Sequence, residues 1–175
     1  MNHSHKLAIF GIGGIGASAL LRAVSLGIEC VAIDIVPWKL IWARELGIKA
    51  VHYNDFPADK EIFDFAIECS GNKKVMENAF KCIKNSGTAI IAGDLKSEET
   101  ISIDPRQLML GKTLDATSGG GSFLDDGASF YAAQYLDGLL PINKLITKVY
   151  DFDEISIGVR DLEAGKLIRG VIKIA

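Results

Sequence analysis

The stretch of sequence that decides the fold runs from residue 6 to residue 16 and reads KLAIFGIGGIG. Its first five residues form an apolar run typical of a buried strand, and residues 14–26 form an uninterrupted helical stretch. Between them, Gly11, Gly13 and Gly16 match the pattern G-x-G-x-x-G. A strand, a glycine-rich turn and a helix in this order predict the first unit of a parallel α/β sheet.

Each glycine of the motif has its own role in a turn that binds phosphate. Gly11 allows the tight turn out of the strand, Gly13 lets the backbone approach a ligand, and Gly16 permits close packing of helix on strand. A pyrophosphate then lies at the helix N-terminus, where unpaired N–H groups face it, and Gly14 and Ile15 complete the turn. The motif predicts a dinucleotide site, and a glycine-rich turn without a ligand is the alternative.

A carboxylate at the end of the second predicted strand indicates which dinucleotide binds. Asp34 lies 18 residues after Gly16, where it can accept hydrogen bonds from the hydroxyls of the adenosine ribose. It would repel the 2′-phosphate of NADP, and its neighbours Ile35 and Val36 supply no arginine for that phosphate. These residues predict NAD as the cofactor. The alternative role for Asp34 is a cap on the following helix.

Outside the motif, short apolar runs alternate with longer helical stretches, a pattern that predicts parallel strands joined by crossover helices. The expected strands are residues 6–10, 30–35, 50–53, 63–69, 88–93, 112–117, 146–150 and 168–174, and the expected helices are residues 14–26, 37–46, 73–83, 125–137 and 153–164. The predicted fold class is therefore α/β, a doubly wound parallel six-stranded Rossmann sheet with helices on both faces and a C-terminal strand-helix-strand extension. We expect a flexible N-terminus over residues 1–5, an NAD-binding domain over residues 6–140 and the extension over residues 141–175.

The composition argues against several other classes of function. The chain has 175 residues, is 49% hydrophobic, and carries a net charge of −3 with no run of more than two basic residues. These values favour a folded domain without a nucleic-acid partner. No apolar stretch reaches the roughly 18–20 residues that span a bilayer, and no signal peptide is evident, so we expect a cytoplasmic protein with no membrane partner.

The cysteines and histidines do not form a metal-binding pattern. Cys30, Cys69 and Cys82 are far apart and lie in or beside apolar stretches, so we interpret them as buried, reduced thiols. The three histidines have no acidic or thiol partner at the spacing of metal ligands. We therefore predict no metal ligand among these residues.

Segments beyond the second strand carry a more specific pattern than the glycine motif. They are residues 63–72 (FDFAIECSGN), Val75-Met76, Gly87-Thr88, Ala92-Gly93, Asp104-Pro105, Gln107-Leu108, Gly111-Lys112-Thr113, Gly119-Gly120, Gly165-Lys166 and Ile168-Arg169. With these segments the chain resembles, from Leu7 to Ile174, the coenzyme-binding half of the zinc-type alcohol dehydrogenases, in the medium-chain dehydrogenase/reductase superfamily. The resemblance implies an oxidoreductase that transfers a hydride between an alcohol and NAD.

The resemblance assigns three charged side chains to the cofactor. Asp34 and Lys39 match the positions that bind the adenosine ribose, and Arg169 matches an arginine that reaches the pyrophosphate. A guanidinium suits a doubly charged diphosphate because its planar fork donates parallel hydrogen bonds. The alternatives are a solvated helix position for Lys39 and a surface ion pair for Arg169.

The resemblance also assigns three loops that follow strands. Cys69-Ser70-Gly71 matches the loop that passes the adenine and ribose, and Ala92-Gly93-Asp94 matches the turn whose backbone meets the nicotinamide. Ser118-Gly119-Gly120 matches a further segment that faces the nicotinamide. With the glycine motif, these loops complete the predicted cofactor site.

The sequence departs from this family in two places. Residues 54–62 are too few for the helix that usually lies there, so we expect at most one helical turn, around residues 59–62, and a partly uncovered sheet face. Family members also carry a GroES-like catalytic domain before the first strand, which supplies the zinc ligands and the proton relay. This sequence begins a few residues before that strand, so we predict no catalytic residue and interpret Asp94 and Asp115 as surface or turn residues.

Three hypotheses for function follow. We favour the NAD-binding domain of a zinc-type dehydrogenase, either truncated or half of a split enzyme, which binds NAD(H) and needs a separate catalytic domain or subunit for turnover. The alternatives are a standalone NAD-sensing or regulatory module without catalysis, and a decayed domain kept for oligomerisation. The strand from Lys112 to Thr117 is expected at the sheet edge, where relatives pair it across a two-fold axis, so we predict a homodimer.

Overall fold

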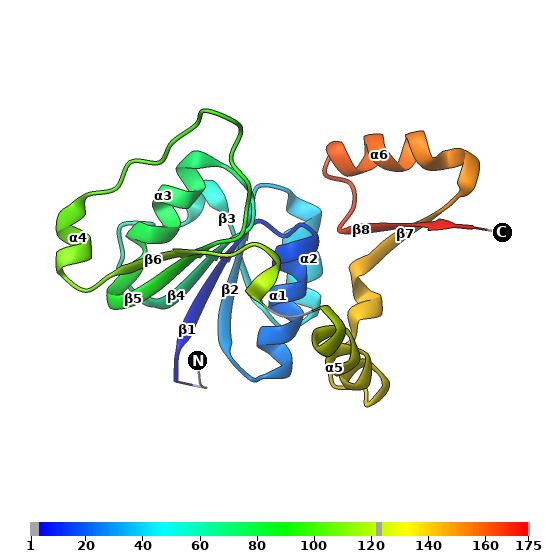
Figure 1. The fold of residues 1–175 in the computed structure, drawn as a ribbon, viewed down its shortest axis with the longest axis horizontal. Coiled ribbons are helices and arrows are strands. Elements are labelled where there is room, and N and C mark those ends of the chain that lie inside the picture. Colours follow the sequence, from blue (N-terminus) through cyan, green and yellow to red (C-terminus); the bar gives the residue numbers. More distant parts are fainter. Residues whose placement is uncertain (1–3, 122–123, 175) are drawn as a thin grey trace.

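The computed structural model describes residues 4–121 and 124–174, and of residues 124–126 it describes the backbone only. A six-stranded parallel sheet has the order β3-β2-β1-β4-β5-β6, and a separate two-stranded parallel sheet, β7-β8, lies toward the C-terminus (Figure 1). The strands are β1 Lys6–Phe10, β2 Glu29–Asp34, β3 Lys49–His52, β4 Phe63–Glu68, β5 Ile83–Ile91, β6 Thr113–Ala116, β7 Ile146–Asp151 and β8 Arg169–Lys173. The predicted fold class is confirmed. Most of the N-terminus predicted to be flexible lies outside the described residues.

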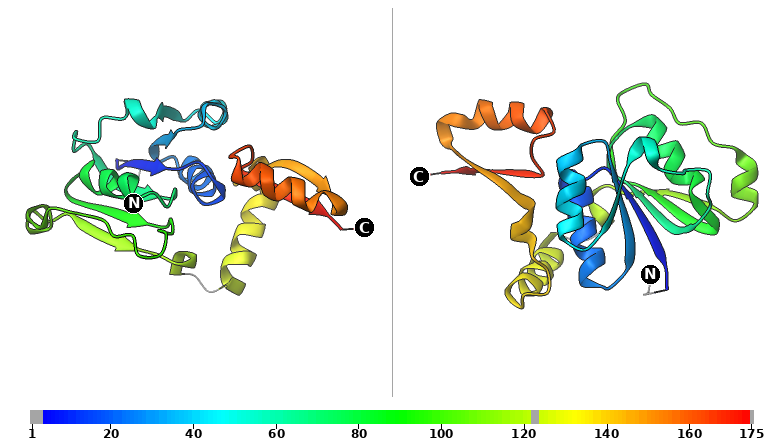
Figure 2. Two further views of the ribbon diagram at one scale, coloured as in Figure 1. Left: turned by 90° about the horizontal axis from the view of Figure 1, so that it is seen from above. Right: turned by 180° about the vertical axis from the view of Figure 1, so that it is seen from behind.

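Helices cover both faces of the large sheet, as a parallel sheet with apolar strands requires. The covering helices are α1 Gly14–Ser25 and α2 Pro37–Glu45 on one face and α3 Lys73–Lys81 on the other, and the chain also has α4 Pro105–Met109, α5 Leu124–Leu136 and α6 Ile155–Glu163. Along β1, Leu7 and Ile9 face a core shared with α1 and α2, whereas Ala8 and Phe10 face a core shared with α3. Figure 2 shows these helices on opposite sides of the sheet. Among the described residues, no helix is both long and apolar enough to cross a membrane.

Local sequence cues set the ends of the first two helices. Pro37 occupies the start of α2, where its missing N–H costs no hydrogen bond. Gly27 and Gly47 follow the ends of α1 and α2 with φ of +63° and +79°. A left-handed residue just beyond a helix is a position that glycine adopts without strain, so both helices end there.

The stretch between β3 and β4 contains no α-helix, as its length led us to expect. A 3₁₀ turn spans Tyr53–Asp55, and nearer to residues 59–62 the Lys60 amide donates a hydrogen bond of 3.1 Å to the Pro57 carbonyl, which closes one non-helical turn and stays within the expected limit. The Nδ1 atom of His52 accepts a hydrogen bond from the Asn54 amide and so caps the turn directly after β3. This side-chain cap draws the turn toward the strand.

Phe56 partly covers the sheet where a helix is missing. Its ring lies 5.1 Å from that of Phe10 and 5.9 Å from that of Phe63, measured between ring centroids. A hollow of about 140 Å³ remains open beside it, lined in part by Val31 and Val51. One aromatic side chain therefore replaces only part of a helix, and this face of the sheet stays partly uncovered.

Two further elements differ from the expected ones. β5 begins at Ile83 rather than at residue 88, and its pairing with β4 shifts register between Phe63 and Phe65. The polar run that follows Ile83 hides this part of the strand from a hydrophobic pattern. The short helix α4 forms because Asp104 accepts a hydrogen bond from the Arg106 amide, and a proline follows this cap.

We call residues 141–174 the C-terminal unit. In it α6 lies over the β7-β8 pair, and the unit stands beside α1 and α2 rather than joining the large sheet (Figures 1 and 2). Ile168 enters the core that α1 and α2 share, and the Trp38 indole Nε1 donates a hydrogen bond of 3.1 Å to the Gly165 carbonyl. These contacts place the start of β8 against α1 and α2, on the side of the large sheet that these two helices cover.

Candidate cofactor site

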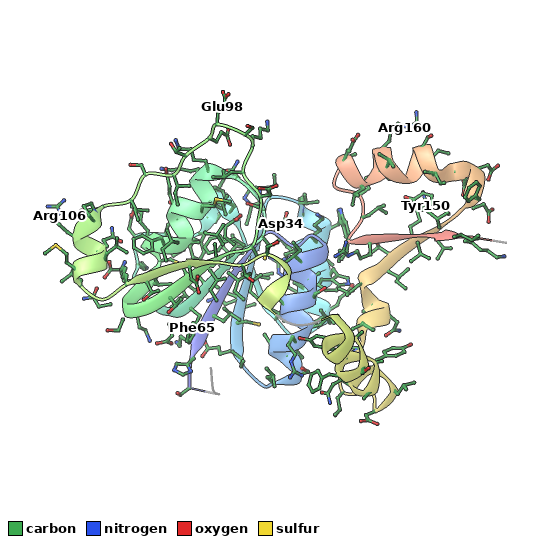
Figure 3. All side chains as sticks on the ribbon, in the orientation of Figure 1. Asp34, Phe65, Glu98, Arg106, Tyr150 and Arg160 are labelled. Atoms are coloured by element: carbon green, nitrogen blue, oxygen red, sulfur yellow. The ribbon has the colours of Figure 1, made fainter. Side chains whose placement is uncertain are left out.

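A cavity of about 280 Å³ opens at the carboxyl ends of β1, β2 and β4. The strand order reverses around β1, and ligands of open parallel α/β sheets bind at such a switch point. Its lining combines four predicted residues, Gly11, Asp34, Ile35 and Ser70, with five residues that sequence reasoning missed, Phe10, Ile33, Tyr53, Asn72 and Val75. The missed residues come from several separate elements, so no local pattern marks them. Figure 3 shows Asp34 at this edge of the sheet.

The glycine turn has the tight packing that its motif predicts. Gly11 has a φ of +85°, and a Cβ built on it would lie 2.9 Å from the Ser70 amide nitrogen. A Cβ on Gly16 would lie 1.8 Å from the Gly11 carbonyl oxygen. Neither position accepts a side chain, because the strand, the helix and the loop after β4 meet there.

Gly13 has a different environment from its two motif partners. A Cβ built on Gly13 would have no neighbouring heavy atom within 4 Å, so open space lies above this residue. Gly13 precedes α1, which has no side-chain cap, and Ile15 at the start of the helix is half exposed. The first amides of α1 therefore face a space where an anion can approach.

Arg169 reaches the start of α1 from the C-terminal unit. A Cβ built on Gly14 would lie 2.2 Å from the Arg169 Cζ, so the guanidinium lies directly against the helix N-terminus. Among the described residues, the Arg169 side chain forms no ion pair. A cation over an uncapped helix start makes two independent attractions for a phosphate group.

Asp34 joins the glycine turn to the segment that begins α2. Its carboxylate Oδ2 accepts a hydrogen bond of 2.5 Å from the Ile12 amide, and Oδ1 accepts one of 2.8 Å from the Val36 amide. The alternative role, a cap on the following helix, is not what the structure shows: α2 has no side-chain cap, and Asp34 binds the amide of Val36, one residue before the helix begins. Each carboxylate oxygen can accept a second hydrogen bond, so a ribose hydroxyl in the cavity can still bind.

Lys39 lies apart from the cavity lining. The residue is buried on α2, and its Nζ is 5.9 Å from the centroid of the Trp38 ring. Among the described residues, Lys39 forms no ion pair. A ribose role for Lys39 rests on the resemblance alone.

The loops after β4 and β5 touch each other through two glycines. A Cβ on Gly71 would lie 2.4 Å from the Asp94 carbonyl oxygen, and a Cβ on Gly93 would lie 2.4 Å from the Gly71 nitrogen. The amides of Ala92 and Gly93 both donate to the Glu68 carbonyl oxygen, at 2.8 and 2.9 Å. The predicted Ser70-Gly71 and Ala92-Gly93 segments are therefore one contiguous structure.

Glu68 is a buried acid at the end of β4 that the prediction of site residues omits. The residue is 0% exposed, and its Oε1 accepts hydrogen bonds from the Ser70 amide at 2.6 Å, the Gly71 amide at 3.1 Å and the Ser70 hydroxyl. Its Oε2 has no hydrogen-bond partner among the described residues. Burial raises the pKa of this carboxyl above its ordinary value. An acid at the last position of an apolar strand is the sequence signal that could have found it.

The cysteines do not contribute a reactive thiol to this edge. Cys30 and Cys82 are buried and Cys69 is partly buried, and none forms a disulfide. Burial raises the pKa of Cys69 to about 12, so its thiol stays protonated at neutral pH. Cys69 instead contributes its amide, which donates to the Phe10 carbonyl at 2.8 Å and fixes the loop beside the glycine turn.

The remaining predicted residues lie away from the cavity. Ser118 and Gly119 follow β6 in an exposed segment, and a Cβ on Gly119 would meet no atom within 4 Å. Asp94 and Asp115 line a different hollow, of about 490 Å³, at the ends of β5 and β6. Among the described residues, no three histidine, cysteine or acidic side chains gather as metal ligands.

A parallel six-stranded sheet with a glycine turn at its switch point defines an α/β protein of the Rossmann type. Residues 14–126 match the family described as zinc-binding dehydrogenase. The chain belongs to this family.

Two kinds of relatives agree with this assignment. The S-(hydroxymethyl)glutathione dehydrogenase of Komagataella pastoris is 34% identical over 181 residues, covering 95% of this chain and 48% of the relative. The structure of benzyl alcohol dehydrogenase from Acinetobacter calcoaceticus superposes with a TM-score of 0.93 at 27% identity, covering 99% of this chain and 51% of that one. An alcohol dehydrogenase zinc-binding domain protein from Burkholderia ambifaria gives a TM-score of 0.90 at 26% identity, with 98% and 49% covered. The chain spans about half the length of these relatives.

Proposed function

We propose that this chain binds NAD(H) as the coenzyme-binding half of an alcohol dehydrogenase-like oxidoreductase. The observation that carries the proposal is the meeting of three features at one switch point. These are an uncapped helix start with open space over Gly13, the Arg169 guanidinium against Gly14, and the Asp34 carboxylate in the cavity lining. A dinucleotide presents a diphosphate and a ribose that match these features.

Different residues of the chain would bind different parts of the cofactor. The α1 amides and Arg169 would hold the pyrophosphate, and Asp34 would accept hydrogen bonds from the adenosine ribose. The apolar cavity lining, with Ile33 and Val75, would receive the adenine and exclude water from it. The cofactor, when bound, supplies a nicotinamide carbon that accepts or donates a hydride. The loop at Gly93 would orient that end.

The preference for NAD over NADP rests on Asp34. Its carboxylate would repel a 2′-phosphate at the ribose position, and Ile35 beside it offers no positive charge. A dehydrogenase of Sinorhizobium meliloti with a TM-score of 0.85 and 21% identity is described as bound to NADP. The fold alone therefore does not select the cofactor, and the side chains at this position must do so.

We further propose that a separate catalytic domain or subunit completes the enzyme and that this chain alone turns over no alcohol. Hydride transfer from an alcohol needs a Lewis acid or a general acid for its oxygen. The C-terminal unit supports such a partner, because its apolar side chains Val149, Phe152 and Leu162 are each more than half exposed. A catalytic partner would cover them.

A homodimer is the proposed assembly. β6 lies at the edge of the large sheet, with one side of its backbone unpaired within that sheet. Beside it, Leu108, Met109 and Leu110 are 42%, 86% and 59% exposed. An apolar corner next to an open strand edge fits a second copy across a two-fold axis. Light scattering at micromolar concentration should give a dimer mass, and a monomer would refute this assembly.

Calorimetric titration of the chain tests the central proposal. We expect NAD to bind, NADP to bind at least tenfold more weakly, and Asp34→Ala to weaken NAD binding at least tenfold while narrowing the difference between the two cofactors. Asp59→Ala, which alters an exposed aspartate, is the matched control and should bind as the native chain does. Failure of the native chain to bind NAD would contradict the proposal. Alcohol turnover by the chain alone would refute its dependence on a partner.

A further inference from the structure

The carboxyl of Glu68 lies between the loop after β4, whose Ser70 lines the proposed adenosine cavity, and the loop after β5, which is proposed to orient the nicotinamide end. Its Oε1 accepts from the loop after β4, at the Ser70 and Gly71 amides. Its Oε2 faces the loop after β5, because a Cβ on Gly93 would lie 2.6 Å from this oxygen. The same residue's main-chain carbonyl holds the Ala92 and Gly93 amides. One residue thus contacts both loops, with its side chain and with its backbone.

The packing of Glu68 differs from that of an ordinary core residue. The large side chains around it in the sheet are apolar, whereas Glu68 is fully buried and leaves Oε2 without a partner among the described residues. An unpaired buried oxygen destabilises the folded state, and the hydrogen bonds at Oε1 must offset this cost. What an apolar residue cannot do is accept the three hydrogen bonds from Ser70 and Gly71.

We infer that Glu68 is a positioning residue, whose carboxyl sets the spacing between Gly71 and Gly93 and thereby shapes the cleft for the nicotinamide half of the cofactor. This inference rests on the proposed binding of NAD. Because Glu68 is fully buried, it would not touch a bound cofactor. It acts through the loop amides that it fixes, before any ligand arrives.

Two variants of similar volume separate hydrogen bonding from space filling. Glu68→Leu keeps the bulk and removes every acceptor, whereas Glu68→Gln keeps the oxygen that accepts from Ser70 and Gly71. We expect Glu68→Leu to raise the Kd for NAD at least tenfold, and Glu68→Gln to stay within threefold of the native value. The Kd for AMP, which lacks the nicotinamide half, should rise less than the Kd for NAD in Glu68→Leu. Glu29→Leu, at an exposed position in β2, is the control and should change neither Kd.

The outcomes of this titration are distinguishable. Native-like binding of NAD by Glu68→Leu would overturn the inference, as would an equal loss for AMP and NAD. If the native chain binds no NAD, the proposed function has failed, and amide hydrogen exchange then decides the role of Glu68. Exchange at Gly71 and Gly93 should speed up at least tenfold in Glu68→Leu and stay native-like in Glu68→Gln. Unchanged exchange in both variants would overturn the inference without any ligand.

Discussion

The large sheet and the C-terminal unit bury their strands to very different degrees. In β1, the four residues from Leu7 to Phe10 are each at most 3% exposed, because helices cover both faces. In β7, Tyr150 is 1% exposed while Ile146 and Val149 are 47% and 58% exposed. The large sheet is covered on both faces and has an extensive buried core, whereas the C-terminal unit has only a small core under α6. Figure 3 shows Tyr150 between β7 and α6.

This difference in burial indicates that the large sheet provides most of the stability, whereas both regions contribute to the binding surface. The cofactor edge is built by strands whose positions are fixed on both faces, so its glycines can pack within contact distance of other backbones. The C-terminal unit contributes Arg169 to the same edge but holds it through few buried contacts, chiefly Leu167 and Ile168. Substitutions in the two regions should therefore have separate effects.

The largest expected effect comes from filling the turn of the large sheet. Gly16→Ala places a Cβ 1.8 Å from the Gly11 carbonyl, so α1 must move away from β1. We expect this overpacking to lower the free energy of unfolding by about 3 kcal/mol. Urea titration followed by the fluorescence of Trp38 and Trp42, which pack against this core, measures it.

Gly13→Ala is the matched control in the same motif. Its Cβ meets no atom within 4 Å, so the free energy of unfolding should change by no more than about 0.5 kcal/mol. NAD affinity should nevertheless fall at least tenfold, because the methyl group occupies the space proposed for the pyrophosphate. Equal stability of the Gly13 and Gly16 variants would show that the strand and helix do not pack as described.

A smaller, local effect is expected in the C-terminal unit. Tyr150 fills its core, and its hydroxyl donates a hydrogen bond of 2.9 Å to the Asp161 carboxylate. Tyr150→Ala should destabilise the unit by about 2 kcal/mol, and hydrogen exchange should accelerate in β7 and β8 alone. The exposed neighbour substitution Val149→Ala should leave exchange unchanged. Faster exchange throughout the large sheet would show that the two regions unfold together.

The sequence predicted the parts of the fold that local chemistry determines. The first two helices begin or end at residues with clear local signals, namely Pro37, Gly27 and Gly47. The apolar run before Gly11 specifies the central strand. These elements therefore lie within a residue or two of their expected bounds. The sequence did not predict the start of β5, because the polar residues there carry no periodic signal. This part of the strand forms because it pairs with β4. Propensity there is overridden by tertiary context.

The residues of the candidate site likewise differ in whether the sequence could predict them. The glycines and Asp34 follow from a short motif whose spacing has a mechanical meaning. The meeting of Arg169 with Gly14 depends on how the C-terminal unit folds back, and only a resemblance to a known family anticipated it. Tyr53 was not predicted because it joins the cavity only through the folding of separate elements, whereas Glu68 had a sequence signal, an acid at the end of an apolar strand, that the prediction did not use.

The smallest effect, a pH-dependent one, tests the most buried charge of the large sheet. Burial raises the pKa of Glu68, so the folded state keeps its proton to higher pH than the unfolded chain, where a glutamate ionises near pH 4.3. The contribution of Glu68 to the free energy of unfolding therefore falls as pH rises above about 4.3, because its ionisation costs less in the unfolded chain. Glu68→Gln has no proton to lose, so it should be more stable than the native chain at pH 7 by about 1 kcal/mol.

Urea titrations from pH 4 to pH 7 measure this difference, which should shrink toward zero at the acid end. Glu29→Gln, at an exposed glutamate, should show no such pH dependence. A constant advantage of Glu68→Gln across this range would mean that the amide acts through hydrogen bonds rather than through removal of a charge. A native chain that is the more stable one at pH 7 would show that the ionised carboxylate is the form that the loop amides stabilise.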